Sequence, residues 1–273
     1  GKLRFLNPEV NFYEMDILDS EVSEILKSEK IETINHHAAQ ISVSESVADP
    51  LFDVNSNIIG TLQLLQSAVS SGVNKFIFAS TGGGMYGEQI FFPASEDHPC
   101  RPLSPYGISK LCAENYITYF YTQYGLSTTI LRYSNVFGPH QNPYGEAGVV
   151  AIFCERLVNN KKPIISGDGK QTRDFVSVND IAQANLLALD PACTGIFNLG
   201  TGVETSINYL TKCLMEISNK NLATEYGPVR SGEQRRSVID YKKFHECFGW
   251  EPEIHLEQGL VETYNFFQNE KFK

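Results

Sequence analysis

In the stretch Lys75-Phe-Ile-Phe-Ala79, a single lysine is followed by four apolar residues, as expected for a strand that is covered on both faces. A helical pattern from Asp53 to Ser71 precedes it, with apolar residues at helical spacing: Ile58, Leu62, Leu65 and Val69. A second helical pattern, Ser104 to Tyr124, and another apolar run, Thr128 to Arg132, follow it. This alternation predicts parallel strands joined by crossover helices, which is a doubly wound α/β fold.

The alternation also extends to both ends of the chain. Toward the N-terminus it predicts a strand from Phe12 to Ile17, a helix from Ser20 to Lys30 and a strand from Glu32 to Ala38. Toward the C-terminus it predicts helices over Gly145 to Asn160, Val178 to Leu189 and Thr205 to Asn219, with short strands over Pro163 to Ser166 and Ile196 to Leu199. We therefore expect a Rossmann-like sheet domain over residues 1–140 and a smaller substrate-binding lobe over residues 141–273 that interleaves with it.

Composition excludes several classes of partner. The formal net charge of −10 argues against a nucleic-acid surface, because phosphate backbones are held mainly by clustered Lys and Arg. No apolar run approaches the roughly 20 residues that a membrane helix needs. The six cysteines form no Cys-x-x-Cys pair and no zinc spacing. We interpret them as reduced thiols of a cytoplasmic protein, and no metal site is predicted.

Polar or small residues follow four of the predicted strands. These strand ends are Asp16-Ile17, His37-Ala-Ala-Gln40, Ser80-Thr-Gly-Gly83 and Tyr133-Ser-Asn135. In doubly wound sheets ligands bind beyond the carboxyl ends of the strands, so these side chains are the candidates for a binding site.

The most informative pair is Tyr106 and Lys110, which are four residues apart near the start of a predicted helix and so share one face. A neighbouring ammonium favours the phenolate, and lowering a phenol pKa by ~3 units corresponds to about 4 kcal/mol. Such a tyrosine could move protons at neutral pH. The alternative at this point is a surface tyrosine with a solvated lysine.

The wider context resembles the extended short-chain dehydrogenases. The resemblance covers essentially the whole chain and is closest to UDP-glucose 4-epimerases. The motifs that carry it are His36-His-Ala-Ala-Gln40, Ser80-Thr-Gly-Gly-Gly-Met-Tyr-Gly-Glu88, Leu131-Arg-Tyr-Ser-Asn-Val-Phe-Gly138, Gly167-Asp-Gly-Lys-Gln-Thr-Arg-Asp174 and Asn198-Leu-Gly-Thr-Gly202. It implies a transient oxidation of a UDP-sugar at C4 by NAD, with Thr81, Tyr106 and Lys110 as the catalytic set and Asn57 supporting them.

The resemblance also assigns binding roles. Residues at NAD-contacting positions are Asp16, Ile17, His37, Ala38, Ala39, Gln40, Asn57, Ser80, Tyr106, Lys110 and Tyr133. Residues at substrate-contacting positions are Thr81, Gly82, Asn135, Val150, Arg173, Arg230, Glu233 and Ser237. His36 and His37 are expected to be packed side chains without a catalytic role. Ser237 stands where the family has a bulky residue that restricts the site to plain hexoses, so N-acetylated sugars are also expected to fit.

Two alternatives stay open. A nucleotide-sugar 4,6-dehydratase would carry Asp-Glu directly after the catalytic threonine, where this chain has Gly82-Gly83. The second alternative is an inactive fragment, because the family's opening Gly-x-x-Gly-x-x-Gly loop, which holds the NAD pyrophosphate at a helix N-terminus, is missing from the printed sequence. On that ground we expect an N-terminally truncated fold with weak NAD binding and low stability. The resemblance further implies a homodimer through the helices Asp53–Ser71 and Ser104–Tyr124.

Overall fold

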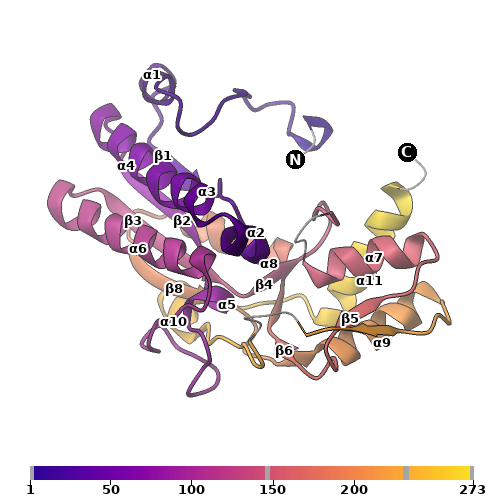
Figure 1. Ribbon diagram of the computed structural model, residues 1–273. Coiled ribbons are helices and arrows are strands. Elements are labelled where there is room, and N and C mark those ends of the chain that lie inside the picture. The colour runs from indigo at the N-terminus through magenta and orange to yellow at the C-terminus, as the bar shows by residue number, and fades with distance from the viewer. Residues whose placement is uncertain (1–2, 145–147, 230–233, 271–273) are drawn as a thin grey trace.

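The centre of the molecule is a four-stranded parallel sheet (Figure 1). The computed structural model describes residues 3–144, 148–229 and 234–270. The strands are β1 (Thr33–His36), β2 (Lys75–Thr81), β3 (Ser127–Tyr133) and β8 (Gly195–Leu199), hydrogen-bonded in the order β1-β2-β3-β8. Helices connect the strands and pack on both faces, so the predicted doubly wound α/β fold is confirmed.

Strand β2 separates two hydrophobic layers, because successive side chains of a strand point to opposite faces. Phe76 and Phe78 pack in one layer with α1 (Val22–Ser28), α4 (Gly60–Ser71) and α6 (Pro105–Tyr124). The apolar stripe expected from helical spacing in these helices is therefore the surface that covers the sheet.

The second layer lies on the opposite face of the sheet. Ile77 and Leu131 pack there with Phe197, with α8 (Val178–Leu187) and with α10 (Lys242–Phe248). A strand buried on both faces needs apolar residues at every position, which is why Phe76-Ile-Phe78 has no polar alternation.

The helix expected from Asp53 to Ser71 has three consecutive parts. They are α3 (Pro50–Val54), the π-helical turn η2 (Asn55–Ile59) and α4. The Asp49 side chain caps the start of α3 by accepting from the Phe52 amide at 3.0 Å. Asn57 lies within the π-helical turn, a distortion that is often found at functional sites.

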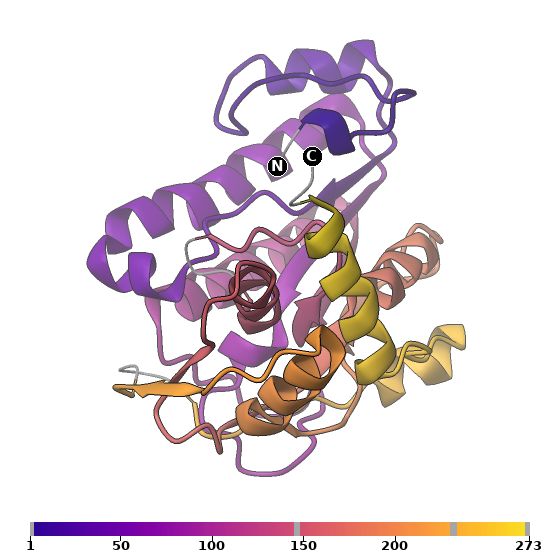
Figure 2. The ribbon, with the colours of Figure 1, turned by 90° about the vertical axis from the view of Figure 1, so that its right-hand side faces the viewer.

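A smaller lobe packs beside the sheet. Its core is formed by α7 (Val149–Val158), α9 (Ile207–Ser218) and α11 (Leu256–Glu270), which Figure 2 shows gathered on one side. Short strand pairs surround this core: β4 (Asn135–Phe137) with β7 (Phe175–Ser177), β5 (Ile164–Ser166) with β10 (Glu225–Gly227), and β6 (Thr172–Arg173) with β9 (Thr205–Ser206). The remaining short elements are η1 (Leu3–Phe5), α2 (Val43–Ala48) and α5 (Gly82–Met85).

Two predictions about strands were wrong. Phe12–Ile17 is irregular and mostly exposed, because it has no neighbouring strand; Tyr13 instead donates a hydrogen bond to Glu29 at 2.7 Å. Ile196–Leu199, which we placed in the smaller lobe, belongs to β8 and pairs with β3 in the central sheet. A short apolar run does not by itself specify its partner, so tertiary contacts decide this assignment.

Within the described ranges, no helix combines the length and the apolar character that crossing a membrane would require.

Candidate active site

Thr81 and Tyr106 are brought together where β2 meets the start of α6. Thr81 ends β2 and accepts a hydrogen bond from the Gly84 amide at 3.0 Å, which caps the short helix α5. Ser104 caps α6 in the same way by accepting from the Gly107 amide at 3.2 Å. Thr81 and Tyr106 are also hydrogen-bonded to each other.

Gly107 permits this close approach. A Cβ atom at Gly107 would lie 2.5 Å from the Gly84 carbonyl oxygen and 2.8 Å from Pro102 Cβ, both shorter than side chains tolerate. The absence of a side chain therefore lets the N-terminus of α6 sit against α5, and this contact fixes the distance between Thr81 and Tyr106.

Lys110 lies one helical turn after Tyr106 and is buried. Its Nζ donates to the Ala79 carbonyl oxygen at 3.0 Å and lies 4.6 Å from the centre of the Phe78 ring. Burial lowers the pKa of Lys110 to about 8, while the carboxylates of Asp53 and Glu114 act in the opposite direction.

The acidity of Tyr106 differs from what its spacing to Lys110 predicted. Burial raises the pKa of Tyr106 to about 12; the hydrogen bond with Thr81 lowers it, and the Asp53 carboxylate raises it. The expected lowering was wrong for this state of the protein, because the Lys110 ammonium is bound to the Ala79 carbonyl and not to the phenol. Tyr106 therefore carries its proton in this structure.

Asn57 fixes the end of strand β1. Its Oδ1 accepts from the Gln40 amide at 3.0 Å, and its Nδ2 donates to the Gln40 carbonyl at 2.9 Å. Both backbone groups of Gln40 are thus held by one buried side chain. Asn57 is a positioning residue in this arrangement, and it acts on the strand end where NAD contacts were predicted.

A cleft of about 680 Å³ lies beside this strand end. Five of the predicted NAD positions line it together: Asp16, Ile17, Ala38, Ala39 and Gln40. Thr81, Tyr106 and Lys110 do not line the cleft. Gln40 does line it, and its backbone also bonds to Asn57. The cleft has both polar and apolar walls, as ligand-binding pockets commonly do.

Both histidines are hydrogen-bonded, but only His36 is buried as expected, whereas His37 is exposed. His36 Nε2 lies 3.1 Å from Thr61 Oγ1, and burial, assisted by the charge of Lys110, lowers the pKa of His36 to about 3. His37 Nε2 lies 3.2 Å from the Tyr133 hydroxyl, which also accepts from Asn185 Nδ2 at 2.9 Å. Tyr133 is therefore held at the end of β3, with its pKa raised by burial.

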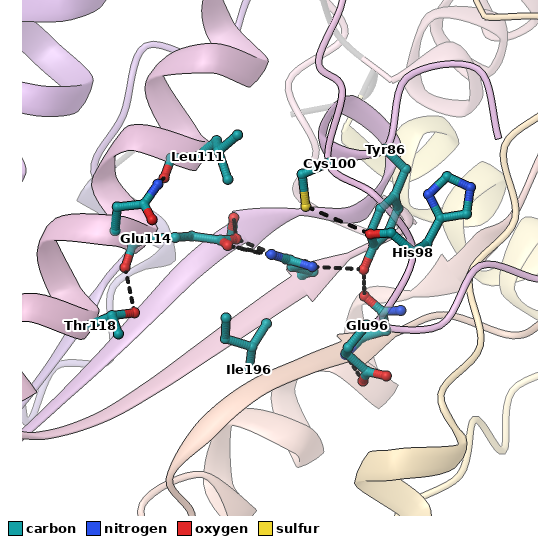
Figure 3. Close-up of polar contacts among 12 residues, drawn as sticks. Tyr86, Glu96, His98, Cys100, Leu111, Glu114, Thr118 and Ile196 are labelled. Atoms are coloured by element: carbon teal, nitrogen blue, oxygen red, sulfur yellow. Dashed lines mark hydrogen bonds and ion pairs between the residues drawn. The ribbon is translucent and has the colours of Figure 1, made fainter. Parts of the chain in front are cut away.

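Ser80 belongs to a buried polar network that the sequence did not reveal. Figure 3 shows the part of this network between Glu114 and Tyr86. Its hydroxyl donates to Glu114 at 2.5 Å, and Glu114 forms an ion pair with Arg132 at 2.6 Å. Arg132 donates to the Tyr86 hydroxyl at 3.0 Å, which donates to Asn198 Oδ1 at 2.6 Å. The Ser80 hydroxyl therefore donates its hydrogen to Glu114 and not to NAD, which Ser80 was predicted to contact.

The predicted substrate residues gather only in part. A Cβ atom at Gly83 would lie 3.8 Å from Ser237 Oγ and 3.9 Å from Asn135 Oδ1, so these two side chains converge two residues after Thr81. Gly82 lies against Ile239, two residues after Ser237: a Cβ atom at Gly82 would be 2.6 Å from the Ile239 side chain.

The other substrate predictions fare differently. Val150 is 1% exposed in the core of the smaller lobe, which leaves no side-chain surface for a ligand. Arg173 is half-buried and donates to the Thr172 carbonyl at 2.7 Å. Arg230 and Glu233 lie outside the described residues.

The segment that carries Ser237 is anchored on both sides. The Val238 amide donates to Gln89 Oε1 at 3.1 Å, and the Ile239 amide donates to Asp174 Oδ2 at 3.3 Å. Asp174, at the end of the Gly167–Asp174 motif, is buried, and burial raises its pKa. Asp174 therefore helps to position the segment that carries Ser237.

Groups of three or more His, Cys, Asp or Glu that could hold a metal ion are not found among the residues that the structure describes.

Comparison with known proteins places these features in context. A model of the NAD dependent epimerase/dehydratase family matches residues 2–200. The UDP-glucose 4-epimerase of Mycolicibacterium smegmatis is 42% identical over 259 residues, which are 94% of this chain and 83% of that protein. The UDP-glucose 4-epimerase of Thermotoga maritima, solved with UDP-glucose, has a TM-score of 0.95 at 46% identity, covering 100% of this chain and 89% of that one. The enzyme of Thermus thermophilus, solved with NAD, has a TM-score of 0.92 at 38% identity, covering 98% and 88%.

Proposed function

Because the chain belongs to the NAD-dependent epimerase/dehydratase family, we propose that it is a UDP-glucose 4-epimerase, which interconverts UDP-glucose and UDP-galactose. The observation that carries the proposal is the cluster of Thr81, Tyr106 and Lys110 at the end of β2. This cluster lies at the carboxyl edge of the sheet, where doubly wound folds bind their ligands.

NAD is the cofactor, and when bound it accepts a hydride from C4 of the sugar and returns it. Asp16, Ile17 and the backbone from Ala38 to Gln40 would hold it along the cleft. In this proposal residues 1–140 hold the cofactor, and residues 141–273 supply most of the substrate contacts, including Ser237.

Tyr106 is the proposed acid and base. It would take the proton of the 4-hydroxyl as the hydride leaves and return it afterwards. For this its pKa must fall from about 12; the Thr81 hydroxyl already lowers it, and the Lys110 ammonium would lower it on turning from the Ala79 carbonyl toward the phenol. Thr81 would also orient the reacting oxygen of the sugar.

Epimerisation is favoured over 4,6-dehydration by the chemistry of the residues after Thr81. A dehydratase needs a carboxyl group beside the sugar, and Gly82 and Gly83 offer none. The nearby carboxylates of Asp53 and Glu114 are both buried and hydrogen-bonded within the protein. We therefore propose that the 4-keto sugar turns over and is reduced without loss of water.

The small side chain of Ser237 supports a broader substrate range. Its Oγ is 3.8 Å from where a Gly83 Cβ would lie. We propose that UDP-N-acetylhexosamines also react, since a small wall leaves room for the N-acetyl group.

A homodimer in the cytoplasm is the proposed state of the protein. Helices α3, η2 and α6 lie side by side (Figure 1). Their outward surfaces expose apolar side chains: Leu51, Ile59, Ile108, Tyr116 and Tyr119. Exposed apolar patches on neighbouring helices are typical of protein interfaces. The six free cysteines support a reducing compartment.

The test is turnover of UDP-galactose by the purified chain, with the NAD released on denaturation measured in parallel. Tyr106→Phe is expected to lower kcat by about 10²- to 10⁴-fold with bound NAD unchanged, because only the proton transfer is removed. Tyr124→Phe, an exposed tyrosine on the same helix, is the matched control. A wild-type chain that binds NAD but turns over no nucleotide sugar would contradict the proposal, and so would a fully active Tyr106→Phe.

A further inference from the structure

Asp53 is a wholly buried carboxylate that joins three elements of the site. It is 0% exposed, and three side chains donate hydrogen bonds to it. Oδ1 accepts from Asn57 Nδ2 at 2.9 Å and from Gln40 Nε2 at 3.1 Å, and Oδ2 accepts from Ser109 Oγ at 2.5 Å. This carboxylate of α3 thereby connects the turn η2, the segment that follows β1 and the first turns of α6.

These three donors are neutral, and a buried charge is costly unless an opposite charge compensates it. Ser109 is directly followed by Lys110, which is buried as well. The other carboxylate near Lys110, Glu114, already accepts three hydrogen bonds from Arg132 at 3.0, 3.2 and 2.6 Å. The charge of Glu114 is thus matched by Arg132, which leaves Asp53 as the carboxylate that matches Lys110.

We propose that Asp53 is the counterion of Lys110 and a positioning residue for the Tyr106–Lys110 pair. It keeps the lysine charged inside the protein and, through Asn57 and Gln40, ties the catalytic helix to the strand end that lines the cleft. The pairing of the Asp53 and Lys110 charges is a property of the folded chain alone. The effect of Asp53 on turnover rests on the proposed function.

The effect on Lys110 has a defined direction. Burial lowers the pKa of Lys110 to about 8, and Asp53 is the larger of the two carboxylate contributions that oppose this. The same carboxylate raises the pKa of Tyr106. Removing the negative charge should therefore lower both values. Other charged and titratable groups facing Lys110 are Glu114, with its partner Arg132, from α6 and β3, and His36 and His37 from β1.

Asp53→Asn is the sharpest test, because the amide has nearly the same shape and its oxygen can still accept from Asn57 and Gln40. The titration of Lys110 is followed by NMR of lysine labelled with ¹³C at Cε, and Lys110→Arg identifies the signal. We expect the titration midpoint of Lys110 to fall by about one pH unit or more, as it does when a nearby opposite charge is lost. No nucleotide sugar is needed for this measurement.

Asp180→Asn is the matched control, since Asp180 is also a buried carboxylate but accepts from the amides of Glu253 and Ile254 at 3.2 Å, away from Lys110. It should leave the Lys110 midpoint unchanged. In an active enzyme, Asp53→Asn should also move both limbs of the pH–activity profile to lower pH. A purely structural role would lower the maximum of the profile without moving it.

A double-mutant cycle with Lys110→Met covers the case in which Asp53→Asn folds poorly. If the two charges compensate each other, the double variant Asp53→Asn/Lys110→Met should be more stable to urea than the two single losses predict when added. Additive losses, or an unchanged Lys110 midpoint in folded Asp53→Asn, would overturn the proposal. An inactive wild-type chain with the expected midpoint shift would instead refute only the proposed function.

Discussion

Ser237 is the side chain on which the proposed substrate range depends. It is buried, and its Oγ lies 3.8 Å from where a Gly83 Cβ would be, two residues after Thr81. Ser237→Tyr would put a bulky ring beside Gly83. We expect the kcat/KM for UDP-N-acetylglucosamine to fall by about tenfold or more, because a filled pocket rejects the larger substrate, while UDP-galactose reacts equally well or better.

Ser237→Ala controls for the loss of the hydroxyl, since it keeps the pocket small-walled and should leave the ratio of the two kcat/KM values unchanged. If Ser237→Tyr also leaves that ratio unchanged, then Ser237 does not limit the substrate.

The contact between α5 and α6 depends on Gly107. Gly107→Ala would place a methyl group 2.5 Å from a backbone oxygen, which cannot rotate away as a side chain would. We expect the free energy of unfolding to fall by about 1–3 kcal/mol, as in overpacked cores. kcat should also fall by about tenfold or more, because the displaced Gly84 amide is the group that Thr81 caps.

Gly227→Ala provides a comparison in the smaller lobe, because its Cβ would have 3.7 Å and 3.8 Å to its nearest neighbours, an ordinary contact distance. Urea unfolding and steady-state kinetics on both variants distinguish steric strain from a general cost of glycine replacement. Wild-type stability and kcat in Gly107→Ala would show that α5 can move away without consequence.

The proposed homodimer can be tested by measuring the mass of the protein in solution. We expect the wild-type protein to sediment with about twice the chain mass of 30.5 kDa. Ile108→Glu puts a charge on the exposed apolar surface of α6 and should give the monomer mass, because a charge buried in an interface is costly. Leu186→Glu places the same charge on α8, on the opposite face of the sheet, and should leave the mass unchanged. A wild-type monomer would contradict the proposed dimer.

Much of the fold could be predicted because its signals are local. The run Phe76-Ile-Phe78 predicted a strand buried on both faces, and the spacing of Ile58, Leu62 and Leu65 predicted a helix that covers it. Tyr106 and Lys110 likewise lie on one helix face because four residues make about one turn. These features depend only on residues that are close together in the sequence.

Other features were decided by contacts between distant segments. The pKa of Tyr106 rises because folding buries the phenol, and Lys110 bonds to Ala79, 31 positions away. Asp53 accepts a hydrogen bond at 2.5 Å from Ser109, which is 56 positions away in the sequence. Periodicity fixes which residues share a face, whereas burial and the pairing of charges depend on which faces meet. The sequence alone therefore determined the strands of the central sheet, the helices that cover it and the spacing of the proposed catalytic pair, and only the tertiary structure decided how that pair is buried and what holds it in place.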